Sequence, residues 1–152
     1  MTNELYEKHC WALVDLDAMQ SNLALIKKTV GAPVCCVVKA DAYGHGAAVA
    51  GLEENGAAAF AASCLAEARH LRRHGISKPI LILGYTDPLQ VDQLVFNCIT
   101  QTVYSEEYAK ALSAAAQNAG VEVHCHFKVD TGMGRIGFSV RSDFEAAIAA
   151  ME

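Results

Sequence analysis

The sequence contains no long hydrophobic run and no strongly basic region. No stretch reaches the roughly 18 consecutive apolar residues that suggest a membrane-spanning helix. The first residues also lack the basic and apolar regions of a signal peptide. No run of lysine or arginine is longer than two residues, and the net charge is −5. Nucleic acids and anionic membranes are therefore poor partners on electrostatic grounds, and a small molecule is the better expectation.

The six cysteines form no CxxC pair. Most of them occupy apolar runs, where a free cysteine behaves as a small buried hydrophobic residue. Cys35 and Cys36 are neighbours, so in a strand their side chains would point to opposite faces. This pattern favours a reducing compartment, and we expect a cytoplasmic location.

What the sequence does contain is a regular alternation of short apolar runs and longer helical patterns. The chain has 152 residues, 53% of them apolar and 19% charged, which is typical of a packed globular segment. Predicted strands are 11–15, 33–39, 57–61, 79–83, 98–103 and 121–129, and predicted helices are 16–29, 47–55, 65–74, 89–95, 106–118 and 142 onward. This alternation predicts right-handed βαβ units and a parallel sheet, with about five units after the first strand and helix.

Residues at the predicted helix ends support these boundaries. Ser63 and Ser105 each precede a helix that carries a carboxylate in its first turn, which suits the positive end of the helix. Glycines follow three of the helices, at positions 56, 75 and 120, where a left-handed residue closes a helix. The last helix, opened by Ser142, is expected to continue at Glu152 without a cap. A closed barrel needs roughly 250 residues, so we expect the chain to be part of a larger fold.

The first candidate site follows the second predicted strand. Lys39 ends an apolar run and precedes Ala40-Asp41-Ala42-Tyr43-Gly44-His45-Gly46. The carboxyl ends of parallel strands are where α/β proteins place reactive groups. An amine that is partly removed from water loses its proton more easily, and a neutral amine can attack an aldehyde to form a Schiff base. An exposed lysine followed by an ordinary glycine turn is the alternative interpretation.

The second candidate site follows the last predicted strand and contains three glycines. Strand alternation places His124, His126 and Lys128 on one face. The loop that follows reads Asp130-Thr131-Gly132-Met133-Gly134-Arg135-Ile136-Gly137-Phe138. An arginine on such a loop can donate a planar pair of hydrogen bonds to an anionic oxygen. A glycine-rich turn with a surface arginine is the alternative.

Both segments resemble the alanine racemase family. Residues 38–46, Val-Lys-Ala-Asp-Ala-Tyr-Gly-His-Gly, resemble the cofactor-binding signature of these enzymes, and residues 126–138 resemble the segment after their fifth barrel strand. Residues 11–17 resemble the opening strand of the family. The family has an eight-stranded α/β barrel followed by a mostly β domain. The resemblance implies that residues 1–152 form the amino-terminal part of a TIM-type (β/α)8 barrel, with the rest of the barrel and the β domain outside this chain.

The resemblance also implies a function, namely pyridoxal-phosphate-dependent interconversion of L- and D-alanine, which supplies D-alanine to the bacterial cell wall. Lys39 would carry pyridoxal 5'-phosphate as a Schiff base and act as one of two catalytic bases. Tyr43 would hydrogen-bond the cofactor phosphate, and Arg135 would donate to its phenolic oxygen. Lys128 matches a lysine that is carbamylated in many members, and a carbamate at this position would pair with Arg135 as an anion.

No residue here matches the second base, which in the family is a tyrosine of the β domain donated across a dimer interface. We therefore expect the isolated chain to bind cofactor weakly and to be inactive. The complete enzyme is expected to be a homodimer acting on a small amino acid. The present chain is expected to self-associate or swap domains, because its edge strands are open.

Three other interpretations remain. One is the racemase domain of a larger serine/alanine racemase, anchored by a membrane segment outside this chain, and another is a non-catalytic pyridoxal-phosphate-binding barrel protein. The third is a chain without a catalytic role. We expect no metal site, because His70 and His74 have no third ligand nearby in sequence and lie among arginines. The Gly132-Met133-Gly134 segment lacks the remainder of a dinucleotide-binding fingerprint.

Overall fold

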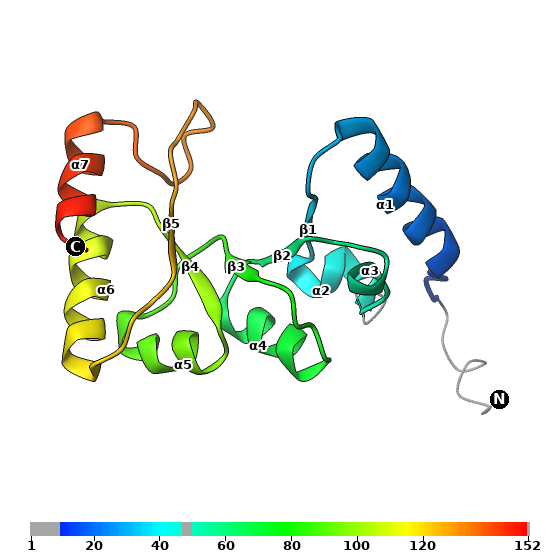
Figure 1. Ribbon diagram of the computed structural model, residues 1–152, viewed down its shortest axis with the longest axis horizontal. Coiled ribbons are helices and arrows are strands. Elements are labelled where there is room, and N and C mark those ends of the chain that lie inside the picture. The colour runs from blue at the N-terminus through cyan, green and yellow to red at the C-terminus, as the bar shows by residue number, and fades with distance from the viewer. Residues whose placement is uncertain (1–9, 47–49, 152) are drawn as a thin grey trace.

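Five parallel strands form one sheet in the order β1-β2-β3-β4-β5. The computed structural model describes residues 10–46 and 50–151. The strands are β1 (Cys35–Val37), β2 (Ala59–Ala62), β3 (Ile80–Ile82), β4 (Ile99–Val103) and β5 (Cys125–Phe127). Each strand pairs with the next one along the chain, so right-handed crossovers all advance in one direction and place their helices on one face. This is the topology of a barrel segment and not of a doubly wound sheet, and Figure 1 shows it as an open arrangement.

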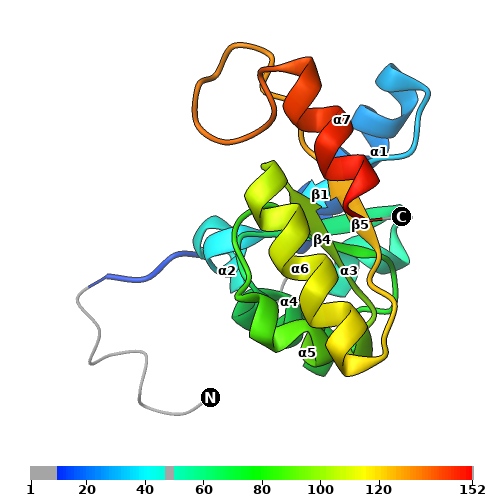
Figure 2. The ribbon, with the colours of Figure 1, turned by 90° about the vertical axis from the view of Figure 1, so that its left-hand side faces the viewer.

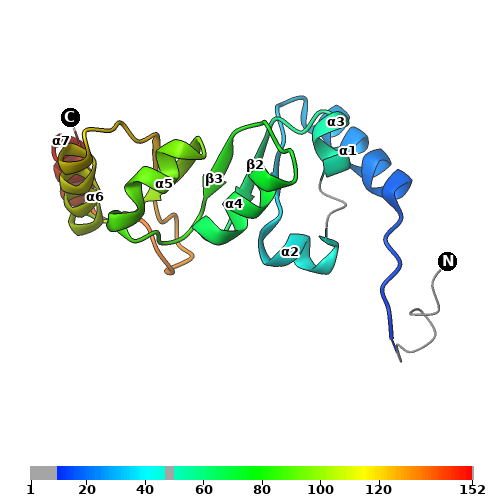
Figure 3. The ribbon, with the colours of Figure 1, turned by 90° about the horizontal axis from the view of Figure 1, so that it is seen from below.

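The helices follow one another along the molecule in chain order. They are α1 (Leu16–Val30), α2 (Lys39–Gly44), α3 (Ala50–Glu54), α4 (Leu65–Arg73), α5 (Val91–Phe96), α6 (Glu106–Ala119) and α7 (Arg141–Ala149), with a 3-10 turn η3 (Pro88–Gln90) before α5. Figure 3 shows α1 and α3 at one end of the long axis and α6 and α7 at the other. Figure 2 shows α6 and α7 from that second end, with the glycine-containing loop after β5 projecting beyond them. None of the described helices is long and apolar enough to cross a membrane.

The hydrophobic core lies between the sheet and the helices that connect its strands. The pairing register aligns Phe60, Ile80 and Ile99 on one face of the sheet, and all three are buried. Leu94 of α5 and Leu112 of α6 are likewise buried against this face. Burial of apolar surface is the main stabilising contribution to such a unit, so this face fixes how the helices stack.

The five strands and most of the helix boundaries confirm the sequence-based predictions. Ser105 caps α6, and its hydroxyl oxygen accepts a 3.1 Å hydrogen bond from the Tyr108 N–H. The three glycines that follow helices have positive φ values of 87°, 88° and 65° at Gly56, Gly75 and Gly120. The predicted helix 47–55 is observed as α3, and its residues 47–49 lie outside the described residues.

The predicted strand 11–15 is wrong. These residues form no strand ladder with any described part of the chain, and Trp11 and Leu13 are 65% and 92% exposed. An extended segment becomes a strand only when a neighbour accepts and donates its backbone hydrogen bonds. Asp15 instead forms the N-cap of α1, where its carboxylate accepts a 2.9 Å hydrogen bond from the Ala18 N–H.

Two further boundaries differ from the predictions. The last helix begins at Arg141 and ends at Ala149, after which the Met151 N–H bonds to the Ile148 carbonyl only three residues back, so the helix ends earlier than predicted; Glu152 lies outside the described residues. Ser63 does not cap α4, because Cys64 holds the N-cap position and the Ser63 hydroxyl donates to the Glu67 carboxylate instead. The second difference arises because the Ser63 hydroxyl has a side-chain partner that the sequence pattern does not identify.

Candidate functional site

Lys39 lies directly after β1, at the carboxyl edge of the sheet. Val38 precedes it, is buried, and donates its N–H to the Ala61 carbonyl at 2.9 Å. The strand itself ends at Val37, and the backbone turns at Val38, with φ −124° and ψ 25°, before α2 begins at Lys39. The lysine is partly buried, and its amine makes no hydrogen bond or ion pair with the described residues. The amine is therefore available for a reaction partner.

The backbone after Lys39 forms a left-handed helical turn. Ala40, Asp41, Ala42 and Tyr43 all have φ between 52° and 54°, although none of them is glycine. A left-handed helical conformation costs roughly 1–2 kcal/mol for each residue with a Cβ atom. Strain of this kind persists only where the surroundings hold it, and it is concentrated at functional sites. The turn therefore marks the Lys39 region as a candidate active site independently of its sequence.

The left-handed turn brings Tyr43 close to Lys39. The Lys39 amine lies 5.4 Å from the centre of the Tyr43 ring, which is within the range of a cation–π contact. Tyr43 is 61% exposed, so its ring is open to solvent next to the amine. Of the predicted site residues, Lys39 and Tyr43 are the two that the structure brings together.

The turn is also held from outside by Glu67, which lies in the first turn of α4. One carboxylate oxygen accepts the Ala40 N–H at 2.9 Å, and the other accepts the Ser63 N–H and hydroxyl, both at 2.7 Å. Burial raises the pKa of Glu67, but these hydrogen bonds and the Lys39 charge outweigh it and hold the pKa below 4.5. No local sequence signal marks this contact, because Ala40 and Glu67 are 27 positions apart.

The second predicted site begins at the end of β5. Lys128 is partly buried and donates its N–H to the Val103 carbonyl at 2.8 Å. The side chains of Val123, Cys125 and Phe127 pack toward the core, whereas His124 and His126 are exposed, as strand alternation predicts. Burial raises the pKa of the Cys125 thiol to about 11.

The loop that carries Arg135 is closed by hydrogen bonds at its base. The Asp130 N–H donates to the Phe138 carbonyl at 2.9 Å, and the Phe138 N–H donates to the Lys128 carbonyl at 2.8 Å. Gly137 has φ 131°, and a Cβ atom there would lie 2.8 Å from the Asp130 nitrogen, so only glycine fits. Arg135 is exposed on this loop.

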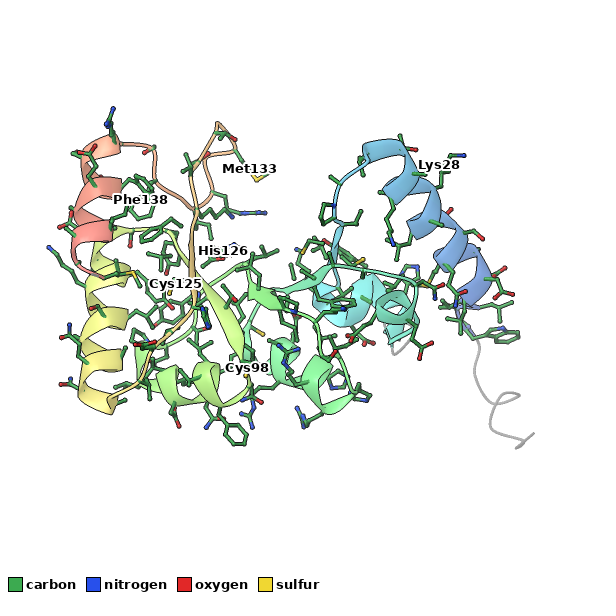
Figure 4. All side chains as sticks on the ribbon, viewed as in Figure 1. Lys28, Cys98, Cys125, His126, Met133 and Phe138 are labelled. Atoms are coloured by element: carbon green, nitrogen blue, oxygen red, sulfur yellow. The ribbon has the colours of Figure 1, made fainter. Side chains whose placement is uncertain are left out.

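Asp130 and Phe138 give the same loop its shape. One Asp130 carboxylate oxygen accepts the Gly132 and Gly134 N–H groups at 2.9 and 3.1 Å, and these bonds lower the Asp130 pKa. Phe138 is buried and packs edge-on against Phe144, with ring centres 5.5 Å apart. Figure 4 shows Met133 at the outer end of the loop and Cys98 at the opposite end of the sheet.

The two motifs therefore lie at the same, carboxyl-terminal end of the strands, but they follow the two outer strands of the sheet. Lys39 follows β1, Lys128 and Arg135 follow β5, and three strands separate them. Because all five strands are parallel, both motifs follow carboxyl ends. In a sheet that curves toward closure, side chains from this edge converge on one mouth.

Two histidines lie close together at the end of α4. The rings of His70 and His74 lie 4.1 Å apart, and the His74 Nδ1 lies 2.9 Å from the His70 carbonyl oxygen. Within residues 10–46 and 50–151, no group of three or more potential metal ligands occurs. The pair therefore gives no reason to assign a metal.

Comparison with known proteins gives consistent matches. The family model described as "Alanine racemase, N-terminal domain" matches residues 14–152. The chain is 46% identical over 149 residues to an alanine racemase of Desulfovibrio desulfuricans, covering 95% of this chain and 40% of that protein. It is 48% identical over 131 residues to the alanine racemase of Clostridium novyi, covering 84% of this chain and 34% of that one. The chain thus spans about 40% or less of the curated relatives it matches.

Solved structures agree with these matches. A Bacillus anthracis alanine racemase with bound L-Ala-P superposes with a TM-score of 0.84 at 32% identity, covering 91% of this chain and 36% of that one. A histidine racemase from Leuconostoc mesenteroides superposes with a TM-score of 0.83 at 34% identity, covering 89% of this chain and 37% of that one. The fold is therefore shared with racemases of more than one amino acid.

Proposed function

The chain belongs to the alanine racemase family, and from this membership we propose that it is the lysine-bearing part of an enzyme that interconverts L- and D-alanine. Residues 1–152 would form the amino-terminal part of the barrel domain, in keeping with their share of the curated relatives. The observation that carries the proposal is Lys39, an available amine at the carboxyl edge of a parallel sheet, followed by a strained left-handed turn.

The residues at this edge fit pyridoxal 5'-phosphate. The Lys39 amine would hold the cofactor covalently, the exposed Tyr43 would hydrogen-bond its phosphate, and Arg135 would donate to its phenolic oxygen. When bound, the cofactor supplies an electron sink that makes the α-proton of an amino acid removable. The availability of the Lys39 amine and the exposure of Tyr43 support this assignment.

Lys39 would also move the proton on one face of the substrate. An amine at the sheet edge can accept the α-proton and return it from the same side. Inversion of the amino acid needs a second acid–base group on the opposite face, and no described residue is proposed for it. Lys128, if carbamylated, would become an anion beside the Arg135 loop and would orient the guanidinium by charge.

The amino acid that the complete enzyme uses is a separate question. Alanine is favoured by the names of the matched relatives, whereas the histidine racemase fold match supports a wider substrate range. Assays of the complete protein with L-alanine, L-serine and L-histidine would decide between them. Turnover of histidine without turnover of alanine would overturn the alanine assignment.

The test of the cofactor role uses this chain directly. Incubation with pyridoxal 5'-phosphate should give a visible absorbance band, which Lys39→Ala should abolish. Lys110→Ala is a matched control, because that exposed lysine pairs with Glu106 in α6, away from the sheet edge. Equal bands in wild type and Lys39→Ala would refute the assignment. We expect the isolated chain to show no appreciable racemisation, because no described residue is proposed as the second acid–base group.

A further inference from the structure

The carboxylate of Glu67 links two strand ends to the first turn of α4. It accepts three hydrogen bonds, from the Ala40 N–H and from the N–H and hydroxyl of Ser63. Ala40 begins the left-handed turn after β1, and Ser63 follows the last residue of β2. If Glu67 accepted hydrogen bonds from Ser63 alone, its only role would be to close the first turn of α4. The additional bond from Ala40 connects α4 to the end of a different strand, β1.

The partner of Glu67 is itself held in place. Gly84 packs so closely on Ser63 that a Cβ atom at Gly84 would lie 2.6 Å from the Ser63 carbonyl oxygen. The Gly84 carbonyl in turn accepts a 2.8 Å hydrogen bond from the side chain of Gln101, which is fully buried in β4. Contacts therefore run from β4 through the end of β2 to the end of β1. These contacts hold Ser63 in place, and Ser63 in turn fixes the carboxylate of Glu67 that accepts the Ala40 N–H.

The left-handed turn needs an external contact of this kind. Its own backbone bonds include Ala42 N–H to Val38 carbonyl at 3.0 Å and His45 N–H to Ala42 carbonyl at 3.1 Å. These bonds do not restrain the Ala40 N–H, and residues with a Cβ atom disfavour the conformation. The bond to Glu67 satisfies that N–H at the point where the chain leaves the strand for the turn.

We propose that Glu67 is a positioning residue that holds the left-handed turn and thereby fixes the direction in which Lys39 and Tyr43 face the cofactor. The cofactor part of this inference rests on the proposed function. The part that concerns the turn does not, because it can be measured in the chain without cofactor.

Two variants separate this role from simple capping of α4. Glu67→Gln keeps the size of the side chain but removes its charge and one acceptor. Glu67→Asp is shorter by one methylene, so it can keep the Ser63 bonds but cannot also reach Ala40. Glu107→Gln is the matched control, since Glu107 is an exposed first-turn carboxylate of α6.

The first readout is amide hydrogen exchange of Ala40, measured by NMR in the cofactor-free chain and referred to core amides such as that of Leu112. Both Glu67 variants should exchange Ala40 roughly tenfold faster, as loss of a hydrogen bond to a charged acceptor implies. The amides of α4 should stay protected in Glu67→Asp. Unchanged Ala40 exchange in Glu67→Asp would overturn the proposal.

The second readout is trapping of pyridoxal 5'-phosphate by borohydride reduction, with the modified lysine located by peptide mass. Wild type and Glu107→Gln should be modified mainly at Lys39, and the Glu67 variants severalfold less at the same fraction folded. Trapping at Lys39 that is equal in all four chains would also overturn the proposal. Absence of trapping at Lys39 in wild type would instead refute the cofactor role of Lys39, while Ala40 exchange still decides the role of Glu67.

Discussion

Arg72 makes four side-chain hydrogen bonds at the amino-terminal ends of the strands, whereas Lys39 lies at their carboxyl-terminal ends. Its guanidinium donates to four backbone carbonyls, at 2.8 Å to Asn97, 2.8 Å to Ile76, 2.7 Å to Lys78 and 2.8 Å to Cys98. These carbonyls belong to the segments that lead into β3 and β4. The planar fork of arginine can serve several separated acceptors at once, whereas a lysine ammonium carries its three donors on a single nitrogen and can reach fewer of these carbonyls.

We therefore predict that Arg72→Lys destabilises the fold substantially. We expect about two of the four bonds to be lost, and hydrogen bonds to a charged group contribute about 1.5–3 kcal/mol each. The site is partly open to solvent, and water can replace some of the lost partners, so we expect about 3 kcal/mol in total. For a chain of this size, such a loss lowers the melting temperature by roughly 6–12 °C.

Urea denaturation followed by circular dichroism measures this free energy of unfolding. Arg73→Lys is the control, because Arg73 lies next to Arg72 in the same helix, is exposed, and makes a single 3.4 Å bond to the Arg69 carbonyl. The control should change stability by no more than about 0.5 kcal/mol. If Arg72→Lys is no less stable than Arg73→Lys, the four carbonyl contacts do not hold this edge and the reasoning is refuted.

Four other predictions concern single residues and the open edges of the sheet. Gly84→Ala should destabilise the fold by about 1–3 kcal/mol in urea titrations, because its Cβ atom would meet the backbone oxygen of Ser63; unchanged stability would contradict the close packing. Glu67→Gln should destabilise by about 1–2 kcal/mol at neutral pH. Because the folded pKa of Glu67 is lowered, its contribution is complete above pH 4.5 and lost as the pH falls below that value, so wild type and variant should converge in acid. A thiol reagent should modify the exposed Cys98 well before Cys125, whose pKa burial raises to about 11, and peptide mapping that finds equal rates would refute this. Because β1 and β5 are edge strands, size-exclusion chromatography should show self-association, and a stable monomer would count against it.

Much of this architecture could be predicted from sequence, because local patterns are enough to define it. The predicted strands 33–39, 57–61, 79–83, 98–103 and 121–129 overlap all five observed strands, and helical periodicity with glycine termini locates most of the helices. Their regular alternation predicts a parallel sheet, and a parallel sheet places Lys39, Lys128 and Arg135 after carboxyl ends. The positions of the candidate site residues could therefore be predicted from the sequence, whereas their chemical roles are implied by the family resemblance.

Features that depend on residues far apart in the sequence were decided only by the tertiary structure. Residues 11–15 have the pattern of a strand, but no described strand pairs with them, so Asp15 caps a helix instead. The left-handed turn after Lys39 could not be predicted, because positions 40–43 contain no glycine, the residue that usually marks a positive φ. It is held by Glu67 from the next βα unit, 27 residues from Ala40. A strand forms only when a neighbouring strand pairs with it, and a strained turn persists only when other residues hold it. Both kinds of partner are distant in the sequence, so local patterns do not identify them.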